Sequence, residues 1–132
     1  MSVAIKEGRT NHDTVQLGSK QTTPKTSATR DAAGEGRKDD QGKTRIELFP
    51  GDVLLAISEI LTSGAIKYED RNWERGMKWS RPFGALMRHM WAWWQGEQLD
   101  AETGKSHLWH AGCCIVFLTA YEMRSIGEDD RP

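Results

Sequence analysis

The stretch RHMWAWWQGEQLDAETGKSHLWHAG, residues 88–112, decides the fold of this chain. It holds three of the four histidines and four of the six tryptophans, on both sides of an acidic turn bounded by Gly96 and Gly104. Apolar side chains recur at helical spacing before Gly96 and again after Gly104. The sequence therefore predicts two helices joined by a turn of about eight residues, and such helices usually pack as antiparallel neighbours.

The ends of these two helices follow from residues with terminal preferences. Ser80 and Pro82 suit a helix start, as N-cap and first-turn proline, and Gly96 suits its end. The next helix is predicted to start near Thr103–Ser106 and to reach about Ser125, with a glycine after it.

A further helix is predicted upstream, over about residues 51–67. Pro50 and Asp52 suit its first turn. Its apolar residues fall on one stripe: Leu54, Ile57, Leu61 and Ala65. The fold class is therefore all-α, a small bundle of three main helices.

The flanks of the bundle are polar. Residues 1–36 show neither helical nor strand periodicity, and we expect a disordered tail there. The folded domain covers residues 37–127, with a short extended segment at TRIELF, residues 44–49. The last residues, 128–132, are expected to be a solvated C-terminal tail.

The tryptophans indicate that the chain is oligomeric. Trp91, Trp93 and Trp94 spread over about 160° of the helix circumference, at about 100° per residue, which is too wide an arc for all three to face one small core. Trp91 and Trp94 suit a core or a subunit interface better than a ligand platform. We therefore expect a homo-oligomer.

Charge and composition exclude several classes of protein. The net charge is −1, so no general attraction to nucleic acid is expected. There is no apolar run long enough to span a membrane and no signal peptide, which favours a cytoplasmic protein. The adjacent Cys113 and Cys114 are interpreted as buried, reduced thiols.

The first candidate site lies around the acidic turn. His89, His107 and His110 are predicted on facing helix edges, beneath Glu97, Asp100 and Glu102. In one interpretation Asp100 and Glu102 only cap the following helix and the histidines bond to the backbone. In the other, the set binds a divalent ion or polarises a phosphate. Carboxylates favour Mg²⁺ or Mn²⁺, whereas imidazoles shift the preference toward Mn²⁺, Zn²⁺ or iron.

The second candidate site is the segment SGAIKYEDRNWERG, residues 63–76. Its cations and hydrogen-bonding groups suit phosphate and base recognition, and Gly64 allows close approach to the backbone. The alternative is an ordinary solvated loop. The residues that would contact a ligand here are Lys67, Tyr68, Arg71, Asn72 and Trp73.

Together these motifs resemble a known family. The order KDDQGKTRIELFP, LTSGAIKYEDRNWERG and then RHMWAWWQGEQLDAETGKSHLWHA is similar to the N-terminal domain of phage dATP/dGTP diphosphohydrolases. The resemblance implies hydrolysis of purine deoxynucleoside triphosphates to a monophosphate and pyrophosphate. It also implies a helical fold akin to the MazG-like pyrophosphohydrolases, a divalent metal (Mg²⁺ or Mn²⁺) and a homo-oligomer in the host cytoplasm.

One departure from those enzymes bears on the chemistry. They carry Glu-x-x-Glu on one helix and Glu-x-x-Asp on a later one, whereas here the first helix offers only Glu59 and the third only Glu122. Either the acidic turn supplies the metal ligands, or the domain binds nucleotides without cleaving them and sequesters a nucleotide, such as a host immune signal. A third option is a purely structural domain.

We assign residues on the first of these alternatives. The predicted metal ligands are His89, Asp100, Glu102 and His107, and the predicted catalytic residues are Asp100, Glu97 and His110. The predicted substrate-binding residues are Lys43, Arg45, Lys67, Tyr68, Arg71, Asn72, Trp73 and Arg88.

Overall fold

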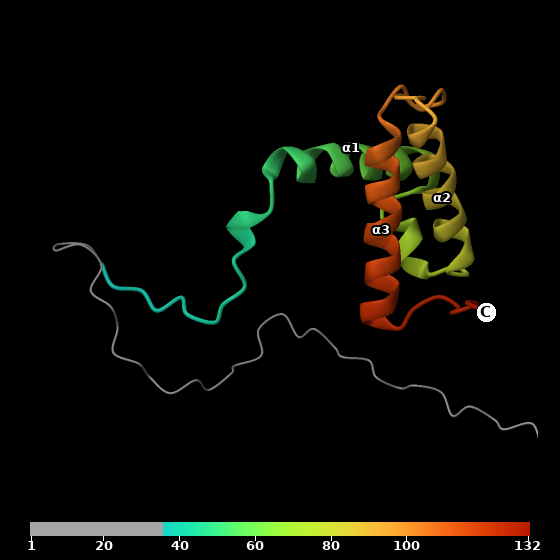
Figure 1. Cartoon of the computed structure of the whole chain (residues 1–132). Coiled ribbons are helices and arrows are strands. Elements are labelled where there is room, and N and C mark those ends of the chain that lie inside the picture. The colour runs from blue at the N-terminus through green and yellow to red at the C-terminus, as the bar shows by residue number, and fades with distance from the viewer. Residues whose placement is uncertain (1–35) are drawn as a thin grey trace, which may run out of the picture. The chain divides into compact units, whose positions relative to one another are not determined.

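The structure of the chain is a computed structural model that describes residues 36–132 (Figure 1). The prediction of a disordered tail over residues 1–36 therefore lies, Gly36 apart, outside the described residues. The chain divides after Leu48 into a short unit and a helical unit, Phe49–Pro132.

The short unit contains a 3₁₀ helix where an extended segment was expected. This helix, η1, covers Ile46–Leu48, and the Leu48 amide donates to the Arg45 carbonyl at 3.1 Å. The prediction of an extended segment is wrong, because an extended segment needs a neighbouring strand to satisfy its backbone. Residues 36–132 contain no such strand, so a local 3₁₀ turn forms the backbone hydrogen bonds of this segment instead.

The helical unit confirms the three predicted helices. They are α1 (Gly51–Tyr68), α2 (Ser80–Trp94) and α3 (His107–Arg124), with a short 3₁₀ helix, η2 (Asn72–Arg75), between α1 and α2. Between residues 36 and 132 there is no strand, and the only β-type pairings are two isolated bridges. No helix in this part of the chain has the length and apolar character needed to cross a membrane.

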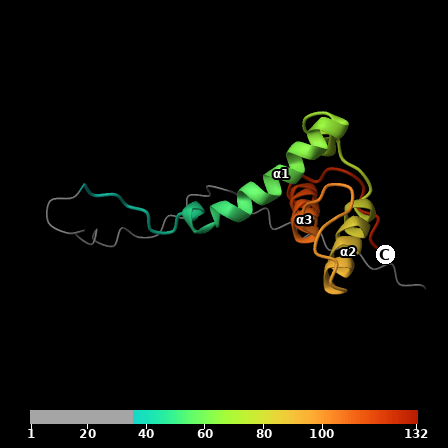
Figure 2. The same ribbon diagram turned by 90° about the horizontal axis from the view of Figure 1, so that it is seen from above.

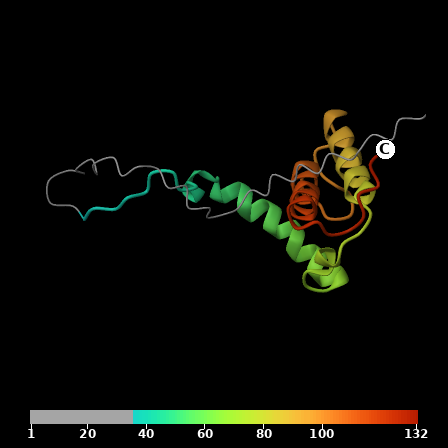
Figure 3. The same cartoon turned by 90° about the horizontal axis from the view of Figure 1, so that it is seen from below.

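Helices α2 and α3 lie side by side and antiparallel, joined by the acidic turn, and α1 crosses α3 (Figures 1, 2 and 3). Gly112 permits the crossing of α1 over α3. A Cβ at Gly112 would stand 2.9 Å from Ile57 Cδ1, so a larger residue would push the two helices apart. Toward its N-terminus α1 is more exposed, and Leu54 of the predicted stripe is 55% accessible.

The core is centred on the inward face of α3, as predicted. His107, Cys113, Cys114 and Tyr121 are buried, and both cysteines are free thiols. Burial raises the pKa of Cys113 to about 12, so this thiol stays protonated and inert at neutral pH. The fully buried Tyr121 donates its hydroxyl to the Trp73 carbonyl at 2.6 Å, which ties η2 to α3.

The apolar stripe of α2 does not face the core. Trp91 and Trp94 are 61% and 73% exposed, so the interpretation of these residues as core is wrong for a single chain. Helix α2 turns its other edge inward, and Leu86, His89 and Trp93 are only partly accessible. Periodicity identifies both edges, but only the position of α3 decides which one is covered.

The C-terminal segment is largely exposed, as expected, yet it is hydrogen-bonded to the start of α2. The Trp79 amide donates to the Glu128 carbonyl at 2.9 Å, and the Ser80 amide donates to the Asp130 carboxylate at 2.8 Å. Asp130 therefore caps α2. Ser80 was predicted as the N-cap but is the first residue of the helix.

Candidate functional site

A groove with a volume of about 1120 Å³ runs between α1, η2 and the inward faces of α2 and α3. Its apolar lining includes Ile60, Gly64, Cys114 and Phe117. Its polar lining comes from two sets of side chains. The first is the region around the acidic turn, and the second is the cationic residues of η2 and of the helix ends near it.

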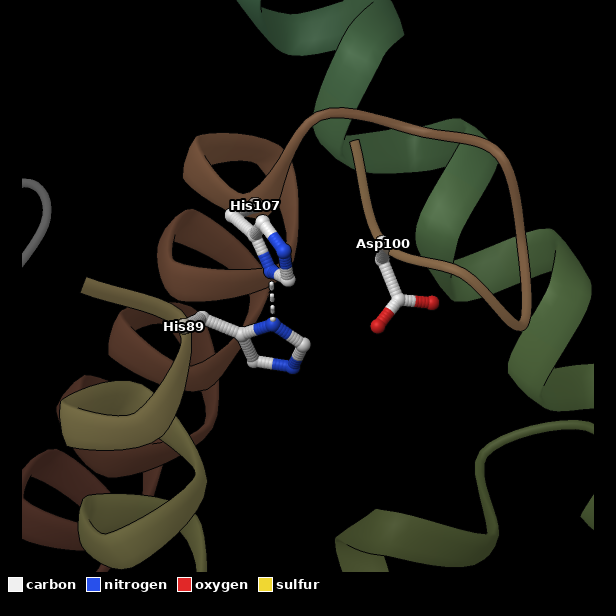
Figure 4. A group of neighbouring side chains, drawn as sticks. All are labelled: His89, Asp100 and His107. Atoms are coloured by element: carbon white, nitrogen blue, oxygen red, sulfur yellow. Dashed lines mark hydrogen bonds between the residues drawn. The ribbon is translucent and has the colours of Figure 1, made fainter. Parts of the chain in front are cut away.

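Three histidines meet beside the acidic turn. Nδ1 of His89 lies 2.9 Å from Nδ1 of His107, and the ring of His89 stacks on that of His110 with centroids 4.5 Å apart and an interplanar angle of 11° (Figure 4 shows the first pair). The prediction that all three would come within reach of one another is confirmed. His89 and His110 line the groove, whereas His107 is buried beneath them.

Local sequence explains this convergence. Ser106 caps α3, and its hydroxyl accepts from the Leu108 amide at 3.2 Å. His107 and His110 therefore fall in the first turn of α3 and share its inward face. His89 stands on the inward edge of α2, which runs antiparallel to α3. Because Ser106 is the cap, the alternative in which Asp100 or Glu102 caps this helix is wrong.

Asp100 holds the acidic turn together. Its Oδ1 accepts from the amides of Glu102 at 3.2 Å and Thr103 at 3.0 Å, and from the Thr103 hydroxyl at 3.1 Å. Burial alone would raise the pKa of Asp100. The Thr103 donors and the nearby His110 and His89 outweigh it and bring this pKa below its ordinary value. Asp100 is thus an ionised carboxylate with a second oxygen left for a cation.

The environment also favours neutral imidazoles. Burial is the main cause that lowers the pKa of both His89 and His110, and it outweighs the opposing attraction of Asp100. Neutral imidazole is the form that binds metal ions. His110 Nε2 lies 2.7 Å from the Thr103 hydroxyl and 3.8 Å from Asp100 Oδ1, which orients the ring.

His107 has an unsatisfied nitrogen. Its buried Nε2 makes no hydrogen bond, although Glu97 Oε1 lies 3.4 Å away. The geometry of this pair is too poor for a hydrogen bond. On the other side of the ring, the contact between the two Nδ1 atoms holds at most one proton, since one nitrogen must accept.

The donor atoms fit a transition-metal ion. His89, Asp100 and His107 each offer one ligand atom, and these atoms lie within 4.8 Å of one another. The 2.9 Å between the two Nδ1 atoms is close to the roughly 3 Å between neighbouring ligands of an octahedral ion, and shorter than the roughly 3.4 Å of a tetrahedral one, at metal–nitrogen bonds of about 2.1 Å. Two nitrogens and one oxygen suit Mn²⁺, Zn²⁺ or Fe²⁺ better than Mg²⁺, which prefers oxygen.

Not every predicted ligand joins this cluster. Glu102 Oε1 instead accepts from Lys67 Nζ at 2.8 Å, and both side chains are largely exposed. This hydrogen bond raises the pKa of Lys67, which stays charged. Glu102 is therefore at the edge of the groove with Lys67, a predicted substrate contact, and is not among the three clustered ligands.

The predicted substrate contacts divide into those that line the groove and those that do not. The groove is lined by Lys67, Tyr68, Arg71, Asn72 and Trp73. Trp73 is not free to stack on a base, because Phe117 stacks on it at 4.7 Å and Arg124 lies 5.8 Å from its ring centroid. Arg88 is exposed and does not line the groove, and its Nη1 approaches Gly84 of its own helix.

Lys43 and Arg45 lie in the short unit before α1. Lys43 Nζ donates to the Asp39 carbonyl at 2.7 Å, and Arg45 Nε donates to Glu47 Oε1 at 2.7 Å. These two residues are therefore engaged in local contacts of their own unit.

Two groove-lining cations were missed from the sequence, Arg81 and Arg124. Arg124 shares Glu74 with Arg71, at 3.8 and 4.0 Å. A signal existed: if α2 and α3 are antiparallel neighbours, the first turn of one meets the last turn of the other. Arg81 and Arg124 occupy those turns.

These features define a small all-α domain with a histidine–aspartate cluster at the side of a cation-lined groove. The chain belongs to the family described as "dATP/dGTP diphosphohydrolase, N-terminal", which it matches over residues 33–131. This match confirms the resemblance seen in the sequence.

A curated relative carries the same description. The chain is similar to a dATP/dGTP diphosphohydrolase of Salmonella phage PMBT28, at 32% identity over 83 residues. The aligned part covers 63% of this chain and 28% of the phage protein, so the chain spans well under a third of that relative. No solved structure matches the chain.

Proposed function

We propose that this domain binds a purine deoxynucleoside triphosphate in the groove and hydrolyses it to the monophosphate and pyrophosphate. The observation that carries the proposal is the juxtaposition of the His89–Asp100–His107 cluster with a groove lined by cations, Lys67 among them. The family and the name of the phage relative supply the substrate class. Cations beside a cluster of metal-ligand type are what phosphoryl chemistry requires.

A divalent metal is part of this proposal. His89, His107 and Asp100 would hold it, and the two imidazoles favour Mn²⁺ over Mg²⁺. When bound, such an ion neutralises phosphate charge and makes water a stronger nucleophile. Glu102, predicted as a ligand, would remain at the edge with Lys67.

The residues of the chain would divide the remaining work. In the reaction a water oxygen bonds to the α-phosphorus while the bond from that phosphorus to the bridging oxygen breaks, and pyrophosphate leaves. Lys67 would neutralise charge on the phosphates. His110, neutral and oriented by Thr103, would accept the proton of the attacking water, with Glu97 as the other candidate base.

A second candidate function is binding without cleavage. It is favoured by the incomplete helix carboxylate pairs: Glu59 is engaged with Lys105 at 2.6 Å, and Glu122 is exposed near the far end of α3. A domain that spans 28% of its relative also leaves room for chemistry elsewhere in that relative. In this alternative the domain sequesters the nucleotide.

The deciding experiment incubates the protein with dATP, dGTP and the other nucleoside triphosphates, with Mn²⁺, Mg²⁺ or EDTA, and separates the products by chromatography. Monophosphate and pyrophosphate formed with Mn²⁺ and lost in His89→Ala would support hydrolysis. Gln95→Ala, at the exposed C-terminal end of the same helix and outside the groove, is the control. Nucleotide recovered intact after heat denaturation of the complex would support sequestration. If the protein neither cleaves nor binds any of the nucleotides, both proposed functions are refuted.

A further inference from the structure

Gly64 is a glycine without a structural reason inside the described chain. It lies in the interior of α1, where glycine destabilises a helix relative to alanine. A Cβ at Gly64 would meet no atom within 4 Å. Gly112 of α3 is different, because a Cβ there would collide with Ile57 where α1 crosses α3. Packing within the chain therefore explains Gly112 and does not explain Gly64.

The position of Gly64 places its bare backbone over the groove. Ile57, seven residues earlier, lies on the same face of α1 and contacts Gly112 at the crossing. Gly64 is about 10 Å further along the helix, and it lines the groove with Cys114 and Phe117. The space beside Gly64 is thus an apolar slot between the α1 backbone and the inward face of α3.

Three of the α3 residues that line the groove with Gly64 are apolar or uncharged: Cys113, Cys114 and Phe117. Phe117 is held in place by Trp73, stacked at 4.7 Å with an interplanar angle of 18°. Cys113 and Cys114 are buried, and their raised pKa values keep them protonated, so they add no charge. Nearby polar groups suit phosphate: Lys67 follows Gly64 by three residues, one helical turn along, and His110 lines the same groove.

We propose that the slot between Gly64 and Phe117 is the nucleobase site of a nucleoside phosphate, with its phosphates directed to Lys67 and the histidine cluster. This inference rests on the proposed function. A nucleobase is flat and apolar on both faces, and glycine is the residue that lets a ligand approach a backbone most closely. The missing side chain at Gly64 leaves the space that the base fills.

The test compares a variant that fills the slot with variants that do not. Gly64→Trp places an indole in the slot, Gly64→Met is a smaller filler, and Gly64→Ala adds one methyl group. Ile66→Trp is the matched control, because Ile66 belongs to the same helix, is 85% exposed and does not line the groove. Binding is measured calorimetrically in Mn²⁺ with the uncleavable α,β-methylene analogues of dATP and dGTP, and with inorganic triphosphate.

We expect Gly64→Trp to weaken analogue binding at least tenfold and to leave binding of inorganic triphosphate within about twofold, since only the base is displaced. Ile66→Trp should bind both ligands as the wild type does. If circular dichroism shows that Gly64→Trp is poorly folded, Gly64→Met replaces it in the test. Gly64→Met should also weaken analogue binding and leave triphosphate binding unchanged, with a smaller loss of analogue affinity.

Other outcomes overturn the base site. The inference is overturned if Gly64→Trp binds the analogues as tightly as the wild type does, or if it loses affinity for the analogues and for inorganic triphosphate equally. In both cases the proposed function stands as long as the wild-type protein binds the analogues. A change from oligomer to monomer in Gly64→Trp would assign the slot to a second copy of the chain and also overturn the inference. A wild type that binds neither ligand would refute the proposed function itself.

Discussion

At the scale of single residues, Asp100 combines two tasks that sequence patterns treat as alternatives. Its Oδ1 accepts three hydrogen bonds that close the acidic turn, and the same carboxylate stands within the cluster with His89 and His107. Stability alone therefore does not show whether Asp100 only closes the turn or also binds a cation. The two roles are distinguishable by comparing two substitutions.

Asp100→Ala should remove the turn acceptor and lower stability by about 0.5–2 kcal/mol. Asp100→Asn keeps an acceptor oxygen but removes the charge, so its melting temperature should lie much closer to that of the wild type. Both should abolish Mn²⁺ binding and nucleotide handling. Glu122→Gln, an exposed carboxylate elsewhere on α3, is the control. Undiminished Mn²⁺ and nucleotide affinity in Asp100→Asn would leave Asp100 as a turn residue only.

The partly buried His89 should make stability depend on pH. His89 has a pKa below its ordinary value of about 6.5, so between the two values the unfolded chain binds more protons than the folded one. Stability is therefore highest above pH 6.5 and decreases as the pH falls through 6.5 toward the folded pKa.

We expect a higher melting temperature at pH 7.5 than at pH 5.5, measured in EDTA so that metal release does not contribute. The difference should be smaller in His89→Phe, which keeps an aromatic ring against His110 but cannot be protonated. An equal pH dependence in the two proteins would show that His89 is not responsible.

Single residues also mark where prediction from the sequence stops. The convergence of His89, His107 and His110 was predictable, because helical period and a short turn fix it. Asp100 was predicted among the ligands and does join them, whereas Glu102 was also predicted and instead bonds to Lys67, which depends on where the end of α1 lies beside the turn. Arg81 and Arg124 were missed because, in the sequence, each has only the features of an ordinary charged residue at a helix end, and only the fold brings the two ends together.

At the scale of elements, helix bounds were predictable to within a few residues and helix orientation was not. The predicted helix over 51–67 is Gly51–Tyr68, because apolar period and terminal residues are local signals. Helix α2 has two apolar edges, and the sequence favoured the one with Trp91 and Trp94. Packing against α3 selects the other edge, which carries His89.

The start of α2 depends on a residue fifty positions away. Asp130 accepts from both the amide and the hydroxyl of Ser80, and these bonds lower the pKa of its carboxyl. Asp130→Ala should therefore lower the melting temperature, and nucleotide affinity should not change because Asp130 does not line the groove.

Asp130→Asn keeps a hydrogen-bond acceptor, so its melting temperature should fall less than that of Asp130→Ala. Because the folded pKa is lowered, the contribution of Asp130 should be present at neutral pH and disappear as the pH falls through that pKa, below about 3.8. If Asp130→Ala melts at the wild-type temperature, the C-terminal segment does not stabilise α2.

At the scale of the whole molecule, the outer face of α2 is the strongest indication that a single chain is not the complete unit. Phe83, Met87, Trp91 and Trp94 follow one another along that helix and are each more than half exposed. Clusters of exposed large apolar side chains are characteristic of protein interfaces, where aromatic residues are enriched. This face lies away from the edge of α2 that carries His89, so it can be covered without closing the groove.

We expect the protein to be at least a dimer at micromolar concentration, measured by light scattering coupled to size exclusion. Trp94→Glu should shift it toward the monomer, because a buried, unpaired carboxylate disfavours association. Gln95→Glu introduces the same charge at the adjacent exposed position and should leave the assembly intact. The groove residues belong to one chain, so a monomeric Trp94→Glu protein should still bind the nucleotide analogues. A wild-type protein that scatters as a monomer would contradict the interface, and a variant that loses association and nucleotide binding together would show that the site needs the second chain.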